Sequence, residues 1–222
     1  MKLLIAIPTY NNYIHSNFSL SLINLISYCC KENIQFIIKY RQGSLINRVR
    51  NEFITDFLKG DFTHILMLDS DLFGFEKMIV EMIEFVKTKN KLLIGGIYIK
   101  KRNTEAYNCN LLNSIEETLQ EEFPEVKHIP TGLMLINKKV IYDLIQHYPN
   151  RRYKDFENKN IYYNFFDSYI KNEYYLSEDY GFCELYKEIG GKIYAHIDGV
   201  IFHNGNIDYS GNFKRFLQNK IS

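Results

Sequence analysis

Two aspartates stand two positions apart, directly after the most apolar run of the chain. The run is His64-Ile65-Leu66-Met67-Leu68, and Asp69-Ser70-Asp71 follows it. Alternate residues of an extended segment share a face, so both carboxylates point to one side. Hard oxygen ligands at this spacing suit Mn²⁺ or Mg²⁺ bridged to a phosphate. An aspartate-rich turn that caps the next helix is the alternative interpretation.

A second acidic cluster, Ser177-Glu178-Asp179, lies where a helical pattern begins. A carboxylate at this place could act as a general base toward an acceptor hydroxyl. Acidic residues in a first helical turn are also favoured by the helix dipole, so a capping role explains the same pattern. The residues alone leave both roles open.

His203 follows a short apolar segment, in Phe202-His203-Asn204-Gly205. A lone histidine is more often structural or simply exposed than a ligand. Together with two aspartates, however, a neutral imidazole could complete a Mn²⁺ shell.

One helical segment carries a polar stripe. Ser44, Asn47, Arg48 and Asn51 fall within roughly one third of the helix circumference, and apolar residues occupy the opposite side. An arginine and two asparagines on one face could hold a diphosphate or a base edge. A solvated helix face is the alternative.

Helices and strands alternate along the first hundred residues. Apolar runs at residues 3–7, 34–38, 64–68 and 92–99 are separated by segments with helical spacing. This order predicts a mostly parallel sheet covered on both faces. Ligands bind at the carboxyl ends of the strands in such sheets. Pro8-Thr9-Tyr10 and Asp69-Ser70-Asp71 both lie at predicted strand ends, so we expect them to line one site.

The second half of the chain is less regular. Residues 103–127 are polar and predict a surface excursion or a lid, whereas residues 132–136 predict a strand and residues 179–189 a helix. Residues 149–175 are crowded with aromatic side chains and have no clean period. Because neither a linker nor an internal repeat is visible, we expect one domain.

Composition excludes several classes of protein. The 222 residues include 27 Lys+Arg and 26 Asp+Glu, so the chain has no basic surplus. This argues against a protein that binds nucleic acid mainly through contacts with phosphates. No stretch approaches the roughly 18 apolar residues of a membrane span. The four cysteines lack CxxC spacing and predict reduced thiols, as in a cytoplasmic protein. Neither a glycine-rich phosphate-binding loop nor a GxSxG nucleophile elbow is present. The sequence therefore lacks the motifs on which kinases, dehydrogenases and serine hydrolases depend.

Taken in order, these motifs resemble the GT-A-fold glycosyltransferases, especially the family-two-like enzymes of bacteria, phages and large DNA viruses. The resemblance extends over roughly residues 3 to 205. Its motifs are Ile7-Pro8-Thr9-Tyr10, residues 44–51, residues 63–71, Pro130-Thr131-Gly132 with its strand, residues 176–183 and residues 202–205.

The resemblance implies a single α/β domain over residues 1–222, with the Rossmann-like GT-A fold and a mostly parallel central sheet flanked by helices. Residues 1–100 would form the nucleotide-sugar half, and residues 101–222 the acceptor and catalytic half. The implied reaction is metal-dependent transfer of a hexose or deoxyhexose from a nucleotide-diphosphate sugar, with a UDP-sugar favoured. The acceptor would be a hydroxyl of a glycan or glycoside, and the anomeric carbon would be inverted.

The resemblance also implies residue roles. Asp69, Asp71 and His203 would bind Mn²⁺ or Mg²⁺. Asp179 would be the general base, with Glu178 as its close competitor. The other contacts to the donor and to the sugar pocket would come from Pro8, Thr9, Tyr10, Arg48, Asn51, Asp69, Ser70, Thr131 and Gly132.

Two other functions remain open at this point. A sugar-phosphate nucleotidyltransferase also uses metal-binding carboxylates, but it carries a glycine-rich basic signature after the first strand, where this chain has residues 8–12. A non-catalytic sugar-binding domain of the same fold is the second alternative. The excess of Tyr and Phe is densest from Tyr148 to Tyr180, and we hypothesise that part of it forms the floor of an acceptor groove.

Overall fold

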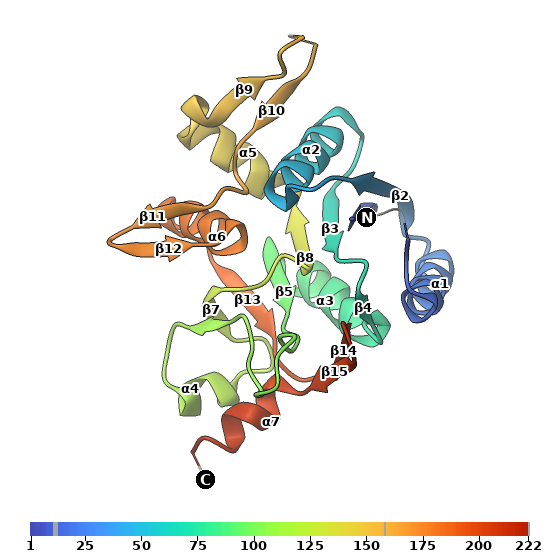
Figure 1. Cartoon of the computed structure of the whole chain (residues 1–222), viewed down its shortest axis with the longest axis vertical. Coiled ribbons are helices and arrows are strands. Elements are labelled where there is room, and N and C mark those ends of the chain that lie inside the picture. Colours follow the sequence, from blue (N-terminus) through green and yellow to red (C-terminus); the bar gives the residue numbers. More distant parts are fainter. Residues whose placement is uncertain (11–12, 158, 222) are drawn as a thin grey trace.

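The computed structural model describes residues 1–10, 13–157 and 159–221. An eight-stranded sheet forms its centre, with the strand order β2-β1-β3-β8-β5-β13-β7-β6, and helices lie against both faces (Figure 1). The strands of this sheet are β1 (Lys2–Thr9), β2 (Gln35–Gln42), β3 (His64–Leu68), β5 (Leu93–Gly96), β6 (Asn110–Leu111), β7 (Glu125–His128), β8 (Leu133–Asn137) and β13 (Ile193–His196). The helices are α1 (Ser16–Lys31), α2 (Ile46–Lys59), α3 (Glu76–Lys89), α4 (Ile115–Gln120), α5 (Lys138–His147), α6 (Glu178–Glu188) and α7 (Phe213–Gln218).

The sheet is mixed. β1 pairs in parallel with β2 and β3, and β5 pairs in parallel with β13. β8 lies between β3 and β5 and runs antiparallel to both, and β7 runs antiparallel to β13. Six of the eight strands thus share one direction, and β8 and β7 run the opposite way. A wholly apolar run such as Leu133–Ile136 shows burial on both faces but not strand direction, so the sequence could not reveal the inversion.

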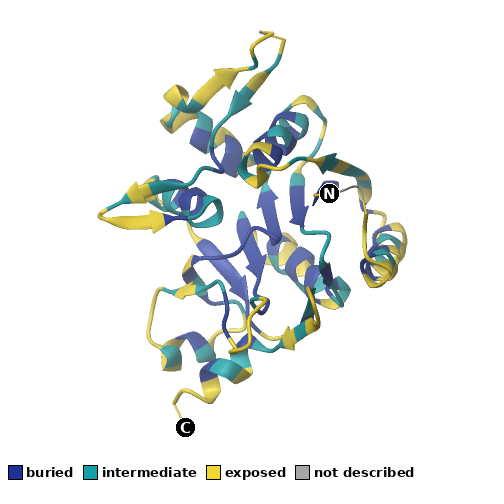
Figure 2. Ribbon diagram, viewed as in Figure 1, coloured by how far each residue is buried: buried dark blue, intermediate teal, exposed yellow. Residues whose placement is uncertain are grey.

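Side-chain alternation along the central strands feeds two separate cores. On β1, Leu3 and Ile5 pack into the core under α1 and α3, whereas Leu4 and Ala6 pack into the core under α2, α5 and α6. This is the pattern of a strand covered on both sides. Figure 2 shows the buried residues concentrated in these central strands.

Residues 103–127 are more than the surface excursion that their polarity predicted. They contain β6, α4 and β7, and β7 pairs with β13 at the edge of the main sheet. Val126 and His128 are buried while Lys127 between them is exposed. That two-residue alternation is the strand signal, but it is too short to stand out in a charged segment.

Two hairpins occupy the aromatic segment that showed no clean period. β9 (Arg152–Lys154) pairs with β10 (Ile161–Tyr163), and β11 (Tyr169–Lys171) pairs with β12 (Tyr174–Leu176). Both project from the body of the molecule (Figure 1). A three-stranded sheet joins β15 (Asp208–Gly211), β14 (Ile201–Asn204) and β4 (Leu72–Phe73). None of the helices within the described ranges has the length and apolar character needed to cross a membrane.

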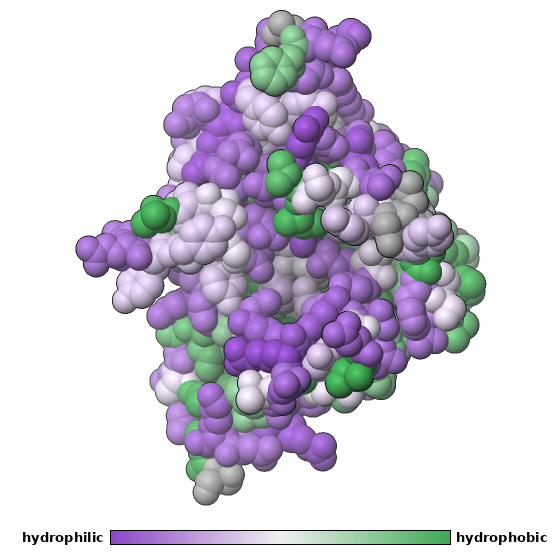
Figure 3. All heavy atoms as spheres, viewed as in Figure 1, coloured by the Kyte–Doolittle hydropathy of each residue, from purple (hydrophilic) through white to green (hydrophobic). Residues whose placement is uncertain are grey.

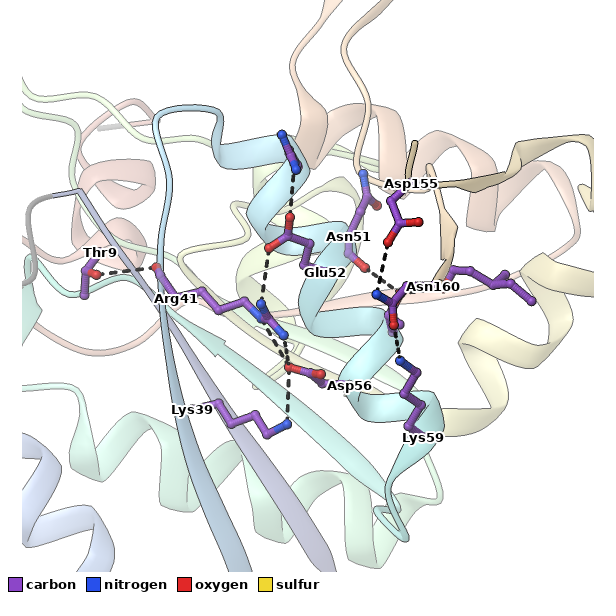
Figure 4. A network of polar contacts seen from close by, with 12 residues as sticks. Thr9, Lys39, Arg41, Asn51, Glu52, Asp56, Lys59, Asp155 and Asn160 are labelled. Carbon is purple, nitrogen blue, oxygen red and sulfur yellow. Dashed lines mark hydrogen bonds and ion pairs between the residues drawn. The ribbon is translucent and has the colours of Figure 1, made fainter. Parts of the chain in front are cut away.

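Helix α2 is fixed to β2 by charged contacts. Arg41 donates to Asp56 at 2.7 Å and to Glu52 at 3.3 Å, and Lys39 lies 3.3 Å from Asp56 (Figure 4). These pairs set how α2 lies against the sheet. They therefore fix which residues of α2 point toward the strand ends.

Candidate active site

Two cavities meet at Asp69. The first has a volume of about 220 Å³ and is lined by Pro8, Thr9, Tyr10, Gly43, Ser44, Ile46, Asp69, Ser70 and Asp71. The second has a volume of about 520 Å³ and is lined by Arg50, Asp69, Tyr98, Lys100, Asn108, Thr131, Gly132, Tyr175, Ser177, Glu178, Asp179, Tyr180 and His203. We call them the strand-end cavity and the acidic cavity. Most of the residues singled out in the sequence therefore line one or the other of two cavities that share Asp69.

The strand-end cavity lies beyond the carboxyl end of β1. Thr9 is buried, and its hydroxyl donates to the Arg41 carbonyl at 3.4 Å. Tyr10 is 78% exposed at the cavity margin. Because β1 and β3 are parallel neighbours, the residues that follow them reach the same edge of the sheet. The structure thus brings Pro8-Thr9-Tyr10 beside the two aspartates, as the sequence predicted.

A buried arginine links the two acidic clusters. Arg50 of α2 lies 3.3 Å from Asp69 Oδ1 through Nη2 and 3.4 Å from Glu178 Oε1 through Nε. Its side chain is only 5% exposed. Burial lowers the pKa of Arg50, but the carboxylates of Asp69 and Glu178 outweigh it and raise that pKa. Burial raises the pKa of both carboxyls, and Arg50 offsets part of the rise.

Several buried polar atoms around Arg50 have no protein partner within the described residues. They include Arg50 Nη1 and Thr131 Oγ1, and Thr131 is only 1% exposed. Both residues line the acidic cavity. A buried donor without an acceptor costs free energy, so these atoms are the ones that hydroxyl or phosphate oxygens of a ligand would satisfy.

Gly132 permits a close approach beside Asp69. A Cβ at this position would lie 2.1 Å from Tyr98 Oη and 2.5 Å from Asp69 Oδ2. The backbone N–H of Asp69 also donates to the Gly132 carbonyl at 2.8 Å. The beginning of β8 therefore seats the first aspartate, and a side chain larger than hydrogen would displace it.

Pairing between β4 and β14 brings His203 to Asp71. His203 lies opposite Leu72 in this pairing, and the Asn204 N–H donates to the Asp71 carbonyl at 2.7 Å. His203 Nδ1 lies 2.8 Å from the Ile99 carbonyl, and Nε2 lies 3.5 Å from Asp71 Oδ2. Because a carbonyl can only accept, the contact with Ile99 places a proton on Nδ1, and Nε2 is the ring nitrogen that faces Asp71.

The expected three-residue metal shell is not assembled as a whole. Among the residues that the structure describes, no three His, Cys, Asp or Glu side chains gather to hold an ion. Asp69 faces Arg50, whereas Asp71 and His203 face each other, and Asp71 Oδ1 is buried without a partner. Mg²⁺ is usually held by one or two carboxylates plus substrate phosphates, so Oδ1 of Asp71, unpartnered among the described residues, fits such an ion, with His203 beside the same carboxylate.

Asp71 is strongly stabilised as a carboxylate. Burial raises its pKa, but contacts with His203 and Lys101 outweigh burial and lower the pKa to about 2. The Lys101 ammonium contacts Asp71 Oδ2 directly. Asp71 is therefore charged at neutral pH and already has one cation beside it.

The two candidate bases differ in their partners. Glu178 is paired with Arg50, whereas Asp179 Oδ1 accepts from the Tyr180 N–H at 2.8 Å and from the Ser177 hydroxyl. The capping role that the sequence left open is thus realised in part, within the first turn of α6. No described residue forms an ion pair with Asp179. Both carboxylates line the acidic cavity.

Arg48 and Asn51, the two α2 residues expected at the nucleotide, lie outside both cavities. The Arg48 side chain is 71% exposed and pairs with Glu52 at 3.1 Å. Asn51 is buried and accepts from the N–H groups of Phe165 and Phe166 at 3.1 and 2.9 Å. Arg48 instead borders a separate groove beside β9 and β10. The structure therefore replaces the expected pair with Arg50.

Arg50 lies outside the polar stripe that the residue spacing predicts, because it is on the buried face of α2. The buried face of α2 contains Arg50, Ile54 and Phe57, spaced four and seven residues apart. An arginine in register with core residues needs a buried carboxylate partner. That register is the signal that could have identified it.

Part of the aromatic segment reaches the acidic cavity. Tyr175 and Tyr180 line it, and the Tyr180 ring stacks on His128 with centroids 4.5 Å apart. Tyr153 and Tyr162 stack on each other in the separate groove. The aromatic excess thus divides between two places.

Comparison with known proteins gives a likeness of structure. No protein-family model and no curated protein matches the sequence. A197 from STIV superposes with a TM-score of 0.52 at 17% identity, covering 93% of this chain and 87% of A197. TarS 1–349 of S. aureus, in complex with UDP-GlcNAc, superposes with a TM-score of 0.51 at 13% identity.

The alignment with TarS covers 97% of this chain and 61% of the TarS structure, so this chain spans about three-fifths of it. A glycosyltransferase involved in glycosylation of the major capsid of PBCV-1 aligns with a TM-score of 0.38, too low to bear on the fold. At these identities the likeness establishes architecture. The chain has the α/β GT-A fold, in one domain with a large central sheet flanked by helices.

Proposed function

We propose that this chain is a glycosyltransferase, which transfers a sugar from a nucleotide-diphosphate sugar to an acceptor hydroxyl. The observation that carries the proposal is the shared border at Asp69. On one side lies the cavity of the β1 end and the two aspartates, and on the other lies the cavity of Glu178 and Asp179. A donor that bridges this border would place its anomeric carbon next to a carboxylate.

The strand-end cavity would take the nucleotide. It lies beyond the carboxyl ends of parallel strands, where α/β sheets bind nucleotides. Pro8, Thr9, Tyr10 and Ser70 line it. TarS, which has a similar fold, was solved with UDP-GlcNAc, and this supports a UDP-sugar as the donor.

Asp71 and His203 would hold Mn²⁺ or Mg²⁺ against the diphosphate. When bound there, such an ion neutralises charge on the leaving nucleoside diphosphate as a Lewis acid. Asp69, paired with Arg50, would orient the donor beside that site. Arg50 Nη1 and Thr131 Oγ1 would supply donors to the transferred sugar and to the acceptor.

Asp179 would act as the general base. It would remove the proton from the acceptor hydroxyl as that oxygen attacks the anomeric carbon. Attack from the face opposite the leaving diphosphate is a single displacement, which inverts the anomeric centre. Glu178 is less suited to this role because Arg50 already pairs with it. The acceptor would be a hydroxyl of a glycan or glycoside, resting on Tyr175 and Tyr180.

A thermal-shift screen tests donor binding directly. A ligand that binds only the folded state raises the melting temperature by mass action. We expect a UDP-sugar to raise it, and Mn²⁺ to increase that rise in the wild-type protein but not in Asp71→Asn. Asp61→Asn, an exposed aspartate paired with Lys2, serves as the matched control. Failure of every nucleotide-diphosphate sugar to shift the transition would contradict the proposal.

The product separates this function from that of a nucleotidyltransferase. A glycosyltransferase releases a nucleoside diphosphate from a nucleotide sugar. A nucleotidyltransferase would instead release pyrophosphate from a nucleoside triphosphate and a sugar phosphate. Pyrophosphate release would therefore replace the proposed function with the runner-up.

A further inference from the structure

One short segment after β5 contacts both residues of the candidate metal pair. The Ile99 carbonyl accepts from His203 Nδ1 at 2.8 Å, and two residues later the Lys101 ammonium contacts Asp71 Oδ2. The backbone of this segment is itself held. Ile99 forms a bridge with Tyr107, and the Lys100 N–H donates to the Ala106 carbonyl at 2.8 Å. These backbone hydrogen bonds thus hold the segment in the position from which Lys101 contacts Asp71.

The contact between Lys101 and Asp71 occupies the oxygen that faces His203. Asp71 Oδ2 contacts the ammonium and also lies 3.5 Å from His203 Nε2. The other oxygen, Oδ1, is buried and has no partner among the described residues. The Lys101 and Asp71 side chains are 35% and 39% exposed, so water screens their attraction only in part.

We propose that Lys101 is an internal cation that competes with the divalent ion for Asp71. The inference rests on the proposed function, because it concerns the ion that would neutralise the diphosphate. An ammonium and a divalent ion cannot share one carboxylate oxygen at bonding distance, and their positive charges repel each other. Entry of an ion at Oδ2 would require Lys101 to leave Asp71, which its flexible four-carbon stem allows. An ion at Oδ1, which has no partner among the described residues, would still lie beside the ammonium and be repelled by it.

Competition of this kind couples the ion to the donor. In the free protein Asp71 is already neutralised by Lys101, so the attraction for a divalent ion is weakened. A bound diphosphate adds negative oxygens that favour the ion and also offers Lys101 a new partner. The wild-type protein should therefore bind Mn²⁺ weakly alone and more tightly once a nucleoside diphosphate is present.

The test is a Mn²⁺ titration of the nucleotide-free protein. Electron paramagnetic resonance measures the concentration of unbound Mn²⁺ at each step. Lys101→Met removes the ammonium and keeps the length of the side chain. We expect this variant to bind Mn²⁺ about tenfold more tightly than wild type, the effect of releasing a partly screened ion pair and one repelling charge. Lys101→Gln should behave in the same way, and adding Asp71→Asn to Lys101→Met should abolish the gain.

Lys139→Met is the matched control, because Lys139 pairs with Asp143 on α5 at 2.7 Å, away from both cavities. Its Mn²⁺ affinity should equal that of wild type. Equal affinities in wild type and Lys101→Met, weaker binding in Lys101→Met, or binding by neither protein would overturn the competition. UDP-sugar binding by the same proteins without metal tests the proposed function separately, since it does not depend on Lys101 leaving Asp71.

Discussion

Asp69 has a different role from Asp71, although the two lie two positions apart. Asp69 borders both cavities and faces the buried Arg50, whereas Asp71 faces His203 and Lys101. The two-residue spacing places both carboxylates on one side of the extended segment. Their partners come from α2, β14 and the segment after β5. In the proposed reaction these partners would make Asp69 the carboxylate that orients the donor and Asp71 the one that binds the ion.

Removing the charge of Arg50 should destabilise the fold. In Arg50→Met, the carboxylates of Asp69 and Glu178 lose their shared cation while they stay largely buried. We expect the free energy of unfolding to fall by about 3 kcal/mol, as for a broken buried ion pair. Urea denaturation measures the change.

Arg48→Met provides the control for this experiment, because the Arg48 side chain is 71% exposed and pairs with Glu52. Its cost should stay below about 1 kcal/mol. If Arg50→Met costs no more than Arg48→Met, the cation does not hold the two acidic clusters together.

The sequence could identify the site residues whose relation is local. The spacing of Asp69 and Asp71, and their place after an apolar run, are visible in the chain itself. Arg50 could not be placed in the same way, because its role depends on how α2 is rotated about its axis. That rotation is set by long-range pairs such as Arg41 with Asp56.

At the scale of elements, Asn51 fastens α2 to the segment before β11. Besides its two accepted bonds, its Nδ2 donates to the Phe166 carbonyl at 2.9 Å and to Asn164 Oδ1 at 3.1 Å. Asn51→Ala removes all four bonds and leaves buried backbone groups unpaired. We expect a loss of about 3 kcal/mol in the free energy of unfolding.

Asn24→Ala is the matched control in the same denaturation experiment, because Asn24 donates an exposed hydrogen bond to Glu76 at 3.2 Å. It should cost well under about 1 kcal/mol. An equal effect of the two variants would show that the Asn51 bonds do not join α2 to residues 164–166.

Helix α6 is held through Glu184. Its carboxylate accepts from Lys171 of β11 at 2.6 Å and from Lys187 at 3.1 Å, and it lies 2.8 Å from Nε2 of His128 in β7. Burial raises the pKa of Glu184, but these partners outweigh burial and lower the pKa to about 2. The folded pKa lies below the unfolded value of about 4.3. The stabilisation is therefore full above the unfolded pKa and is lost as the pH falls toward 2.

Glu184→Gln should reduce this acid sensitivity. The difference in unfolding free energy between pH 6 and pH 3 should be smaller in the variant than in wild type, because glutamine does not titrate. Burial also lowers the pKa of His128, so part of the loss on acidification persists. If the free energy of unfolding depends on pH identically in the two proteins, titration of Glu184 does not contribute to the loss of stability in acid.

Long apolar strands and amphipathic helices were predictable, but edges and insertions were not. β1 and β3 are buried on both faces, and their continuous apolar runs predict this burial. β7 alternates for only four residues within a charged segment, and the direction of β8 is decided by its neighbours in the sheet. Both are consequences of pairing between distant segments, which residue patterns do not encode.

At the scale of the whole molecule, the candidate site gathers residues from nearly the full chain. The ends of β1 and β3, the start of β8, the first turn of α6 and β14 all meet around Asp69 and Asp71. Figure 3 shows a face on which hydrophilic residues dominate. In the proposed reaction, a charged donor would enter the strand-end cavity and a hydroxylated acceptor would enter the acidic cavity.

The most direct test of this account compares donor binding with turnover in Asp179→Asn. Turnover is followed as release of nucleoside diphosphate from a UDP-sugar, with water in place of the acceptor. We predict that Asp179→Asn keeps the thermal shift caused by the UDP-sugar but releases nucleoside diphosphate about 10²–10⁴-fold more slowly, the usual contribution of a general base. Full turnover in Asp179→Asn, with turnover lost in Glu178→Gln instead, would contradict the assignment of the base. Full turnover in both Asp179→Asn and Glu178→Gln would contradict the acidic cavity as the catalytic site.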